Sequence, residues 1–122
     1  MFYKSQVFHG AKEGTKKAYP TINLDPQVLP TNLKKGVYAS WVKIDNKVFP
    51  GAAYFGPRLV KNEHFDVLEI FVLDFSAQIY GREVEFSLEQ YIRGVMDFTD
   101  FSLLKEQISK DIRDIKQSLN VE

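Results

Sequence analysis

Apolar and polar residues alternate along several short stretches of the chain, which is the pattern of half-buried β-strands. The clearest stretches are 36–44 and 83–88, and 48–55 follows the first of them after a polar turn at 45–47. The segment 67–73 is apolar at nearly every position, so we expect both of its faces to be covered. With a short first strand at 6–8, about five or six strands are expected, which suggests a closed or nearly closed antiparallel barrel.

The end of the chain changes to a helical period. Five apolar residues recur at spacings of four, four, three and four, which is one stripe of an amphipathic helix. We expect this helix at about 100–119, capped by Thr99, Asp100 or Ser102 and packed on the barrel. The stripe consists of Leu104, Ile108, Ile112, Ile115 and Leu119, and the face expected to be solvated carries Lys105, Glu106, Lys110, Asp111, Arg113, Asp114 and Lys116.

The composition favours one globular domain over residues 1–122. Hydrophobic residues make up 44% of the chain, with 10 Phe, 6 Tyr and one Trp, which fits a packed core. Lys and Arg number 16 and Asp and Glu number 16, so the chain lacks the basic excess of a nucleic-acid binder. The absence of cysteine excludes disulfides and thiolate metal sites.

No stretch has the length of a membrane span, and the first residues lack the apolar segment of a signal peptide. We therefore expect a cytoplasmic protein with no nucleic-acid or membrane partner, acting as a monomer.

The segment Pro20-Thr21-Ile22-Asn23 offers two neutral oxygen donors on a short element. Proline restricts the backbone, and if the chain stays extended, Thr21 and Asn23 point to the same side. Hydroxyl and amide oxygens suit Mg²⁺ that is held mostly by substrate phosphates. The preceding loop, 9–17, is rich in small and basic residues that could carry a nucleotide's negative charge. Alone, such a pair is more often a plain turn or strand start.

The order of motifs along the chain resembles the riboflavin kinase family, and the resemblance covers roughly residues 4 to 120. No single block decides this, but together they are specific. The blocks are Val7-Phe8-His9-Gly10 with Gly14, Tyr19-Pro20-Thr21-Ile22-Asn23-Leu24, Gly36-Val37-Tyr38-Ala39, Leu68-Glu69-Ile70-Phe71-Val72-Leu73-Asp74-Phe75, Ile79-Tyr80-Gly81, Tyr91-Ile92-Arg93 with Asp97-Phe98, and the terminal helix with Leu104, Ile108 and Asp111.

The resemblance implies a six-stranded antiparallel Greek-key barrel with a C-terminal helix. It also implies transfer of the γ-phosphoryl group of ATP to the ribityl 5′-hydroxyl of riboflavin, with FMN and ADP as products. Mg²⁺ is the expected cofactor, with Zn²⁺ or Mn²⁺ as alternatives. In many bacteria this barrel follows an FMN adenylyltransferase domain, for which these 122 residues leave no room, so a free-standing or excised module is expected.

The resemblance also implies roles for individual residues. Thr21 and Asn23 would ligate the metal, and Glu69 would be the catalytic carboxylate that takes the proton from the attacking hydroxyl. From the residues alone, a glutamate in this position is more often paired with a cation on a strand edge, and Arg93 could equally be an ordinary surface arginine. The remaining residues are Gly10, Gly14, Thr15, Lys16, Val72, Asp74 and Tyr80 for the nucleotide, and Arg93 and Phe98 for the flavin.

Several positions depart from the family pattern. Thr15 replaces a basic residue, Ala18 replaces a glycine, and Met96 replaces a basic residue. The segment Gly56-Pro57-Arg58-Leu59 lacks the family's Pro-Thr pair. These departures leave a second hypothesis open, a divergent module that binds flavin or nucleotide without catalysis.

Overall fold

The computed structural model describes residues 1–8, 21–58, 64–75, 77, 79–98 and 100–121. None of the helices in these ranges has the length and apolar character needed to cross a bilayer. In chain order, the described elements are β1 (Tyr3–Gln6), β2 (Ile22–Leu24), a short 3₁₀ helix η2 (Pro26–Val28), β3 (Gly36–Ile44), β4 (Lys47–Pro57), β5 (Asp66–Val72), β6 (Glu83–Phe86), β7 (Gln90–Arg93) and α1 (Phe101–Ser118).

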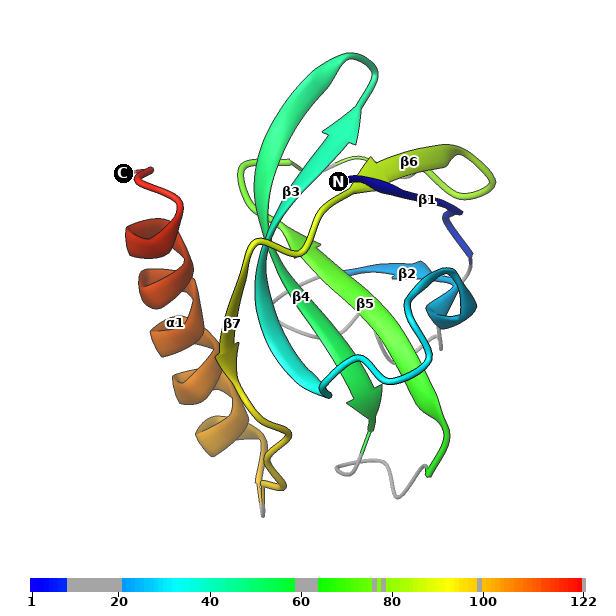
Figure 1. Ribbon diagram of the computed structural model, residues 1–122. Coiled ribbons are helices and arrows are strands. Elements are labelled where there is room, and N and C mark those ends of the chain that lie inside the picture. The colour runs from blue at the N-terminus through cyan, green and yellow to red at the C-terminus, as the bar shows by residue number, and fades with distance from the viewer. Residues whose placement is uncertain (9–20, 59–63, 76, 78, 99, 122) are drawn as a thin grey trace.

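Six strands form a nearly closed antiparallel barrel in the order β1-β6-β3-β4-β5-β2 (Figure 1). The two ends of this order meet where the Phe8 amide donates to the Asn23 carbonyl at 2.8 Å and the Asp25 amide donates to Ser5 Oγ at 2.9 Å. Strands β3, β4 and β5 are successive neighbours in the sheet. Strand β2, which a long connection joins to β3, lies on the far side of β5, and this arrangement is a Greek key. The predicted six-stranded Greek-key barrel is confirmed.

Strand β7 is a seventh strand that the sequence did not reveal. It pairs with β3 along the same edge as β6, since Val42 is opposite Phe86 and Tyr38 is opposite Tyr91. Each of its residues is exposed or only half-buried, so it lacks the alternation that marks the other strands. Strand β7 therefore pairs with the part of β3 that β6 leaves open, and it lies between the barrel and α1 (Figure 1).

The two faces of β3 contribute to two different apolar clusters. Tyr38 and Val42 point into the barrel, whereas Val37 and Ala39 pack with Ile115 of α1. Because neighbouring side chains alternate along a strand, residues on opposite faces of β3 contribute to different clusters. The barrel interior consists of Val7, Ile22, Leu24, Leu29, Tyr38, Val42, Ile44, Ala53, Phe55, Leu68, Ile70, Val72, Ile79, Val84 and Phe86.

Helix α1 packs with its predicted apolar stripe toward the sheet, and Ile115 is fully buried. Asp100 caps the helix, with Oδ1 accepting from the Leu103 amide at 3.0 Å. Hydrogen bonds from Ser102, and then from Leu103, lower the pKa of Asp100. Asp111 was expected on the solvated face, and this expectation is wrong: only 3% of Asp111 is exposed.

Two local expectations also differ from the structure. The first strand covers Tyr3–Gln6 and not 6–8, because Phe8 makes only an isolated bridge to Asn23. The β3–β4 turn is shorter than predicted: Asp45 and Asn46 have φ of 51° and 66°, and Lys47 already belongs to β4. Positive φ at both positions fits a two-residue hairpin turn.

Gly36 is expected to be the least replaceable of the described glycines. Its φ is 149°, and a Cβ added there would lie 2.1 Å from the Arg93 carbonyl oxygen. We predict that Gly36→Ala lowers the free energy of unfolding by at least ~2 kcal/mol in urea titrations followed by circular dichroism. The control is Gly81→Ala, where φ is 82° and nothing lies within 4 Å, so only backbone strain of about 1 kcal/mol is expected. Equal losses in the two variants would show that the contact with β7 is unimportant.

Candidate functional site

A row of aligned residues crosses five strands on the outside of the barrel. Asn23 of β2 is opposite Glu69 of β5, which is opposite Tyr54 of β4. Tyr54 is opposite Val37 of β3, which is opposite Arg93 of β7. Val37 and Tyr54 belong to the cluster under α1, so the row lies on the outer face. The polar residues of the row therefore lie on the same face of the sheet as α1.

Four polar side chains converge at the β2–β5 end of this row. Thr21 Oγ1 donates to Glu69 Oε2 at 3.1 Å. Arg58, the residue after β4, donates from Nε to Glu69 Oε1 at 2.7 Å and from Nη2 to Asn23 Oδ1 at 3.0 Å. The cluster is largely shielded from water, since the side chains of Arg58 and Glu69 are 16% and 11% exposed. Thr21, Asn23 and Glu69 are thus brought together as the sequence predicted, and Arg58 joins them.

Tyr54 holds the backbone that precedes Arg58. Its hydroxyl donates to the Pro57 carbonyl. Burial raises the pKa of Tyr54; Arg93 acts against this rise, and Glu69 and Asp66 add to it. The phenol is therefore neutral at physiological pH and can donate this hydrogen bond. Because Pro57 is fixed, the Arg58 side chain starts from a defined point beside Glu69.

The donor set of this cluster fits a divalent cation. Thr21 offers a hydroxyl, Asn23 an amide oxygen and Glu69 a carboxylate, which are the hard oxygen ligands that Mg²⁺ prefers. The Arg58 guanidinium contacts both Asn23 Oδ1 and Glu69 Oε1, so a positive charge already lies against these oxygens. Within the described residues, no three His, Cys, Asp or Glu side chains form a metal-binding group. A set so poor in anionic ligands suits an ion that also binds phosphate oxygens.

Arg93 is held by a buried carboxylate at the other end of the row. Nε lies 2.9 and 3.1 Å from the two Asp111 carboxylate oxygens, and Nη2 lies 2.8 Å from Oδ2. Nη1 donates to the Gly94 carbonyl at 2.9 Å, and Gln107 Nε2 donates to Asp111 Oδ1 at 3.0 Å. Arg93 is therefore neither an ordinary surface arginine nor an unengaged group. It fixes α1 to β7, and direct contact with flavin stays a prediction.

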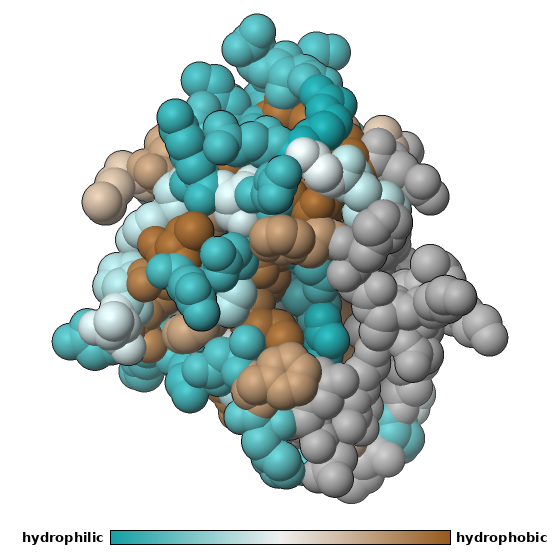
Figure 2. Space-filling model, turned by 90° about the vertical axis from the view of Figure 1, so that its right-hand side faces the viewer, coloured by the Kyte–Doolittle hydropathy of each residue, from teal (hydrophilic) through white to brown (hydrophobic). Residues whose placement is uncertain are grey.

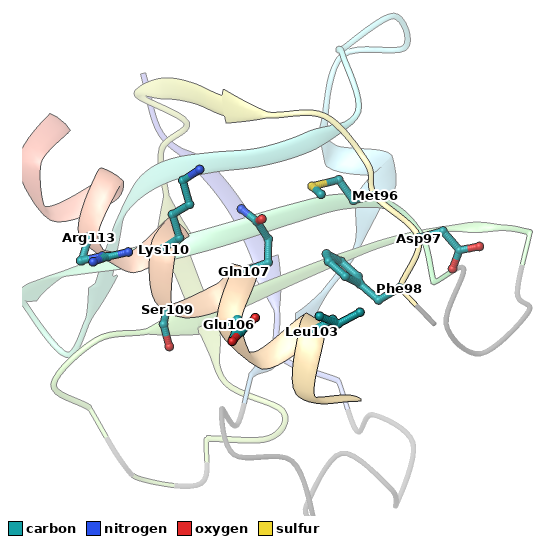
Figure 3. A pocket seen from close by; sticks show the side chains of 9 residues that line it. All are labelled: Met96, Asp97, Phe98, Leu103, Glu106, Gln107, Ser109, Lys110 and Arg113. Carbon is teal, nitrogen blue, oxygen red and sulfur yellow. The ribbon is translucent and has the colours of Figure 1, made fainter. Parts of the chain in front are cut away.

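A pocket of about 810 Å³ lies between the segment after β7 and the part of α1 from Leu103 to Arg113 (Figure 3). Met96 and Phe98 point toward the helix, whereas Asp97 points away from it. Leu103 adds a third apolar group to the lining. The volume is in the range of small-molecule sites, which are about 300–1,000 Å³. The polar lining residues are Asp97, Glu106, Gln107, Ser109, Lys110 and Arg113.

The segment after β7 connects this pocket to the polar cluster. A Cβ added at Gly56 would lie 3.0 Å from Val95 Cγ2 and 3.2 Å from the Tyr54 hydroxyl. Gly56 is two residues before Arg58, so the chain from Val95 to Phe98 begins beside the strand end that carries Arg58. The pocket and the cluster are therefore neighbours on the outer face.

The predicted nucleotide residues have different surroundings. Val72 is 4% exposed and points into the barrel, so its side chain is unavailable to a ligand. Asp74 is exposed in a turn with φ of 60°, and Tyr80 is 42% exposed. Gly10, Gly14, Thr15 and Lys16 lie outside the described residues, as do Ala18 and Leu59.

Two hydrogen bonds bring the turn after Tyr80 next to the end of β1. The Gly81 amide donates to the Val7 carbonyl and the Val7 amide donates to the Arg82 carbonyl, both at 2.8 Å. Phe8, 45% exposed, follows on this side of the barrel. Figure 2 shows this side of the molecule, where hydrophobic surface is exposed between hydrophilic residues.

Sequence reasoning did not identify Arg58 or Tyr54 as parts of the site. Arg58 lies in a segment that departs from the family pattern. A basic residue in a loop is part of no repeating pattern, so the sequence does not show which residue it pairs with. Tyr54 looked like any aromatic residue of a strand. The one usable signal was the alternative that Glu69 pairs with a cation on a strand edge. The structure shows the cation, Arg58, but β5 lies between β2 and β4 and not at an edge.

A model of the riboflavin kinase family, described as Flavokinase, matches residues 1–119 of this sequence. The chain therefore belongs to the riboflavin kinase family. A bifunctional riboflavin kinase/FMN adenylyltransferase of Haemophilus influenzae is 39% identical over 118 residues, which cover 94% of this chain and 37% of that protein. The chain thus corresponds to little more than a third of that relative's length.

Two solved structures show the same fold. A Streptococcus pneumoniae protein described as a macrolide-efflux protein superposes with a TM-score of 0.78 at 24% identity, over 94% of this chain and 38% of that one. A riboflavin kinase from Trypanosoma brucei superposes with a TM-score of 0.65 at 20% identity, over 98% of this chain and 79% of that one. At such identities, these structures support the barrel-and-helix architecture alone.

The Arg93–Asp111 pair is expected to contribute strongly to stability. Asp111→Ala leaves the Arg93 charge buried without its partner, so we predict a loss of about 3–5 kcal/mol in the free energy of unfolding. Urea titration followed by circular dichroism measures the loss. The control is Asp114→Ala on the exposed face of the same helix, where a change within about 0.5 kcal/mol is expected. A loss at position 111 no larger than this would mean that the pair does not hold α1.

Proposed function

We propose that the chain transfers the γ-phosphoryl group of ATP to the 5′-hydroxyl of riboflavin, giving FMN and ADP. The convergence of Thr21, Asn23 and Glu69 on the outer face carries this proposal. Phosphoryl transfer requires in-line positioning, neutralisation of charge and a group that orients the nucleophile. The cluster offers oxygen ligands for a cation and a carboxylate for the nucleophile. Membership of the riboflavin kinase family supports riboflavin and ATP as the two substrates.

Thr21 and Asn23 would hold a divalent cation together with the phosphates of the nucleotide. We propose Mg²⁺, with Mn²⁺ or Zn²⁺ as alternatives. When bound, the ion neutralises charge on the phosphoryl group and orients it. Since Thr21 and Asn23 lie two residues apart at β2, a single extended segment presents both oxygens to the same face.

Glu69 would accept the proton of the riboflavin 5′-hydroxyl as the new oxygen–phosphorus bond forms. It lies in the middle of β5, between β2 and β4, so the ladder on both sides fixes its position. A positioned general base contributes roughly 10²- to 10⁴-fold to the rate. Arg58 compensates the charge of this shielded carboxylate in the absence of ligand.

The pocket beside α1 would hold the flavin ring. Met96, Phe98 and Leu103 offer an apolar lining for a flat aromatic system, and Gln107 and Lys110 offer polar groups to its heteroatoms. Phe98 and Arg93 are the proposed contacts with the flavin. Arg93 would act chiefly by holding Asp111, and with it the helix wall of the pocket, in place.

The nucleotide would lie on the side of the barrel where β1 ends. Tyr80 offers an exposed aromatic ring there, and Asp74 is proposed as a second contact. Gly10, Gly14, Thr15 and Lys16 are proposed from the family pattern to surround the phosphates, and Val72 to contribute through its backbone. In this proposal residues 1–122 act as one cytoplasmic catalytic domain and as a monomer.

Glu69→Gln tests the catalytic role, because it preserves size and removes the carboxylate. We predict that kcat for FMN formation, followed by chromatography, falls by about 10²- to 10⁴-fold. Glu85→Gln on β6 is the matched control and should keep kcat within a factor of two or so. Wild-type protein that binds riboflavin and forms no FMN with Mg²⁺, Mn²⁺ or Zn²⁺ would contradict the proposal and favour a non-catalytic binding module.

Asn23→Ala tests the metal-ligand role. We predict that the Mg²⁺ concentration giving half the maximal rate rises by about tenfold or more, since one of few protein ligands is lost. Asn32→Ala, at an exposed turn position, is the control and should leave this concentration unchanged. An equal loss of rate at every Mg²⁺ concentration would argue against a ligand role for Asn23.

A further inference from the structure

The Arg58 guanidinium contacts the same oxygens that a metal ion would use. Nη2 lies 3.0 Å from Asn23 Oδ1, and Nε lies 2.7 Å from Glu69 Oε1. A divalent cation on Asn23 Oδ1 would place two positive charges against one neutral oxygen in a shielded site, where charge repulsion is strong. Arg58 and a metal therefore cannot both occupy Asn23 without a large cost.

Arg58 can leave Asn23 without movement of the backbone. Tyr54 fixes the Pro57 carbonyl, so the start of the side chain is constant and its dihedral angles allow the guanidinium to turn. The planar guanidinium forms bidentate hydrogen bonds with phosphate as well as with carboxylate. A nucleotide phosphate that arrives with the metal supplies the partner that Arg58 needs when it leaves Asn23.

We propose that Arg58 is an exchanging cation of this site. In the ligand-free protein it takes the place of the metal on Asn23 and Glu69, and with metal and nucleotide bound it contacts the phosphates. This inference rests on the proposed function for the identity of the ligand. Arg58 therefore has two opposite effects: it weakens binding of a divalent cation alone, and it strengthens binding of the cation with a nucleotide.

The test measures both affinities for Arg58→Gln without riboflavin or turnover. The probes are Mn²⁺ alone, followed by electron paramagnetic resonance, and Mg²⁺–ADP, followed by calorimetry. We expect Mn²⁺ alone to bind about tenfold more tightly, because the competing cation is removed. We expect Mg²⁺–ADP to bind about tenfold more weakly, because charged hydrogen bonds to phosphate are lost. The double variant Arg58→Gln with Asn23→Ala should lose the gain in Mn²⁺ affinity.

Two further variants keep the interpretation clear. Arg82→Gln removes an arginine whose partner Asp45 is exposed, and it should change neither affinity. Arg58→Lys keeps the charge and lacks the fork, so its affinities should fall between those of the wild type and Arg58→Gln. If Arg58→Gln does not fold, as judged by circular dichroism, Arg58→Lys replaces it in the test. Tighter binding of Mn²⁺ and weaker binding of Mg²⁺–ADP are then expected for Arg58→Lys.

Loss of both affinities would show that Arg58 only supports the fold, and a gain in both would show competition without a phosphate contact. Either result, or no change in the two affinities, would contradict the proposal that Arg58 exchanges with the metal. Failure of FMN formation would contradict the proposed function and would not alter these binding measurements.

Discussion

The pairing of β5 with β2 on one side and β4 on the other determines where each group of the candidate site lies. Glu69 is opposite both Asn23 and Tyr54, so one register brings together a carboxylate, a neutral oxygen ligand and the residue that holds Pro57. The apolar core enforces this register, since Leu68 and Ile70 on either side of Glu69 fill the barrel. A slip of one residue would turn Glu69 into the apolar barrel interior and turn Leu68 and Ile70 to the outer face.

The outer face carries two arginine–carboxylate pairs that differ in character. Arg93 engages both oxygens of Asp111, whose side chain is 4% exposed, and joins two elements of the fold. Arg58 contacts the neutral Asn23 as well as Glu69, and it follows the end of β4. Gln107 donates a further hydrogen bond to Asp111 and strengthens the hold of the first pair, whereas the second pair adjoins oxygens suited to a cation. The Arg93–Asp111 pair therefore suits a structural role, and the Arg58–Glu69 pair suits exchange of the guanidinium for a metal ion.

Strand and helix periods predicted most of the fold, because they depend on burial along a single element. The hairpin of β3 and β4 and the apolar stripe of α1 were predicted in this way. The placing of Thr21 and Asn23 on one side follows from alternation along a single extended segment. Strand β7 was missed because its four residues are nowhere fully buried. Asp111 was placed on the solvated face because a charged residue is expected to be exposed, and its buried partner, Arg93, lies 18 positions earlier in the sequence. Arg58 depends on a contact across 35 positions to Asn23, which no local pattern contains.

We propose that the oxygens of Thr21 and Asn23 hold the metal and its bound phosphates beside Glu69, the proposed base. The most direct measurement is broadening of backbone amide signals by Mn²⁺–ADP, compared with Mg²⁺–ADP as the diamagnetic reference. We predict the strongest broadening at residues 21–23 and 68–70, with Arg58 among the affected amides. Strongest broadening along α1, or broadening spread over the surface without a centre, would contradict it.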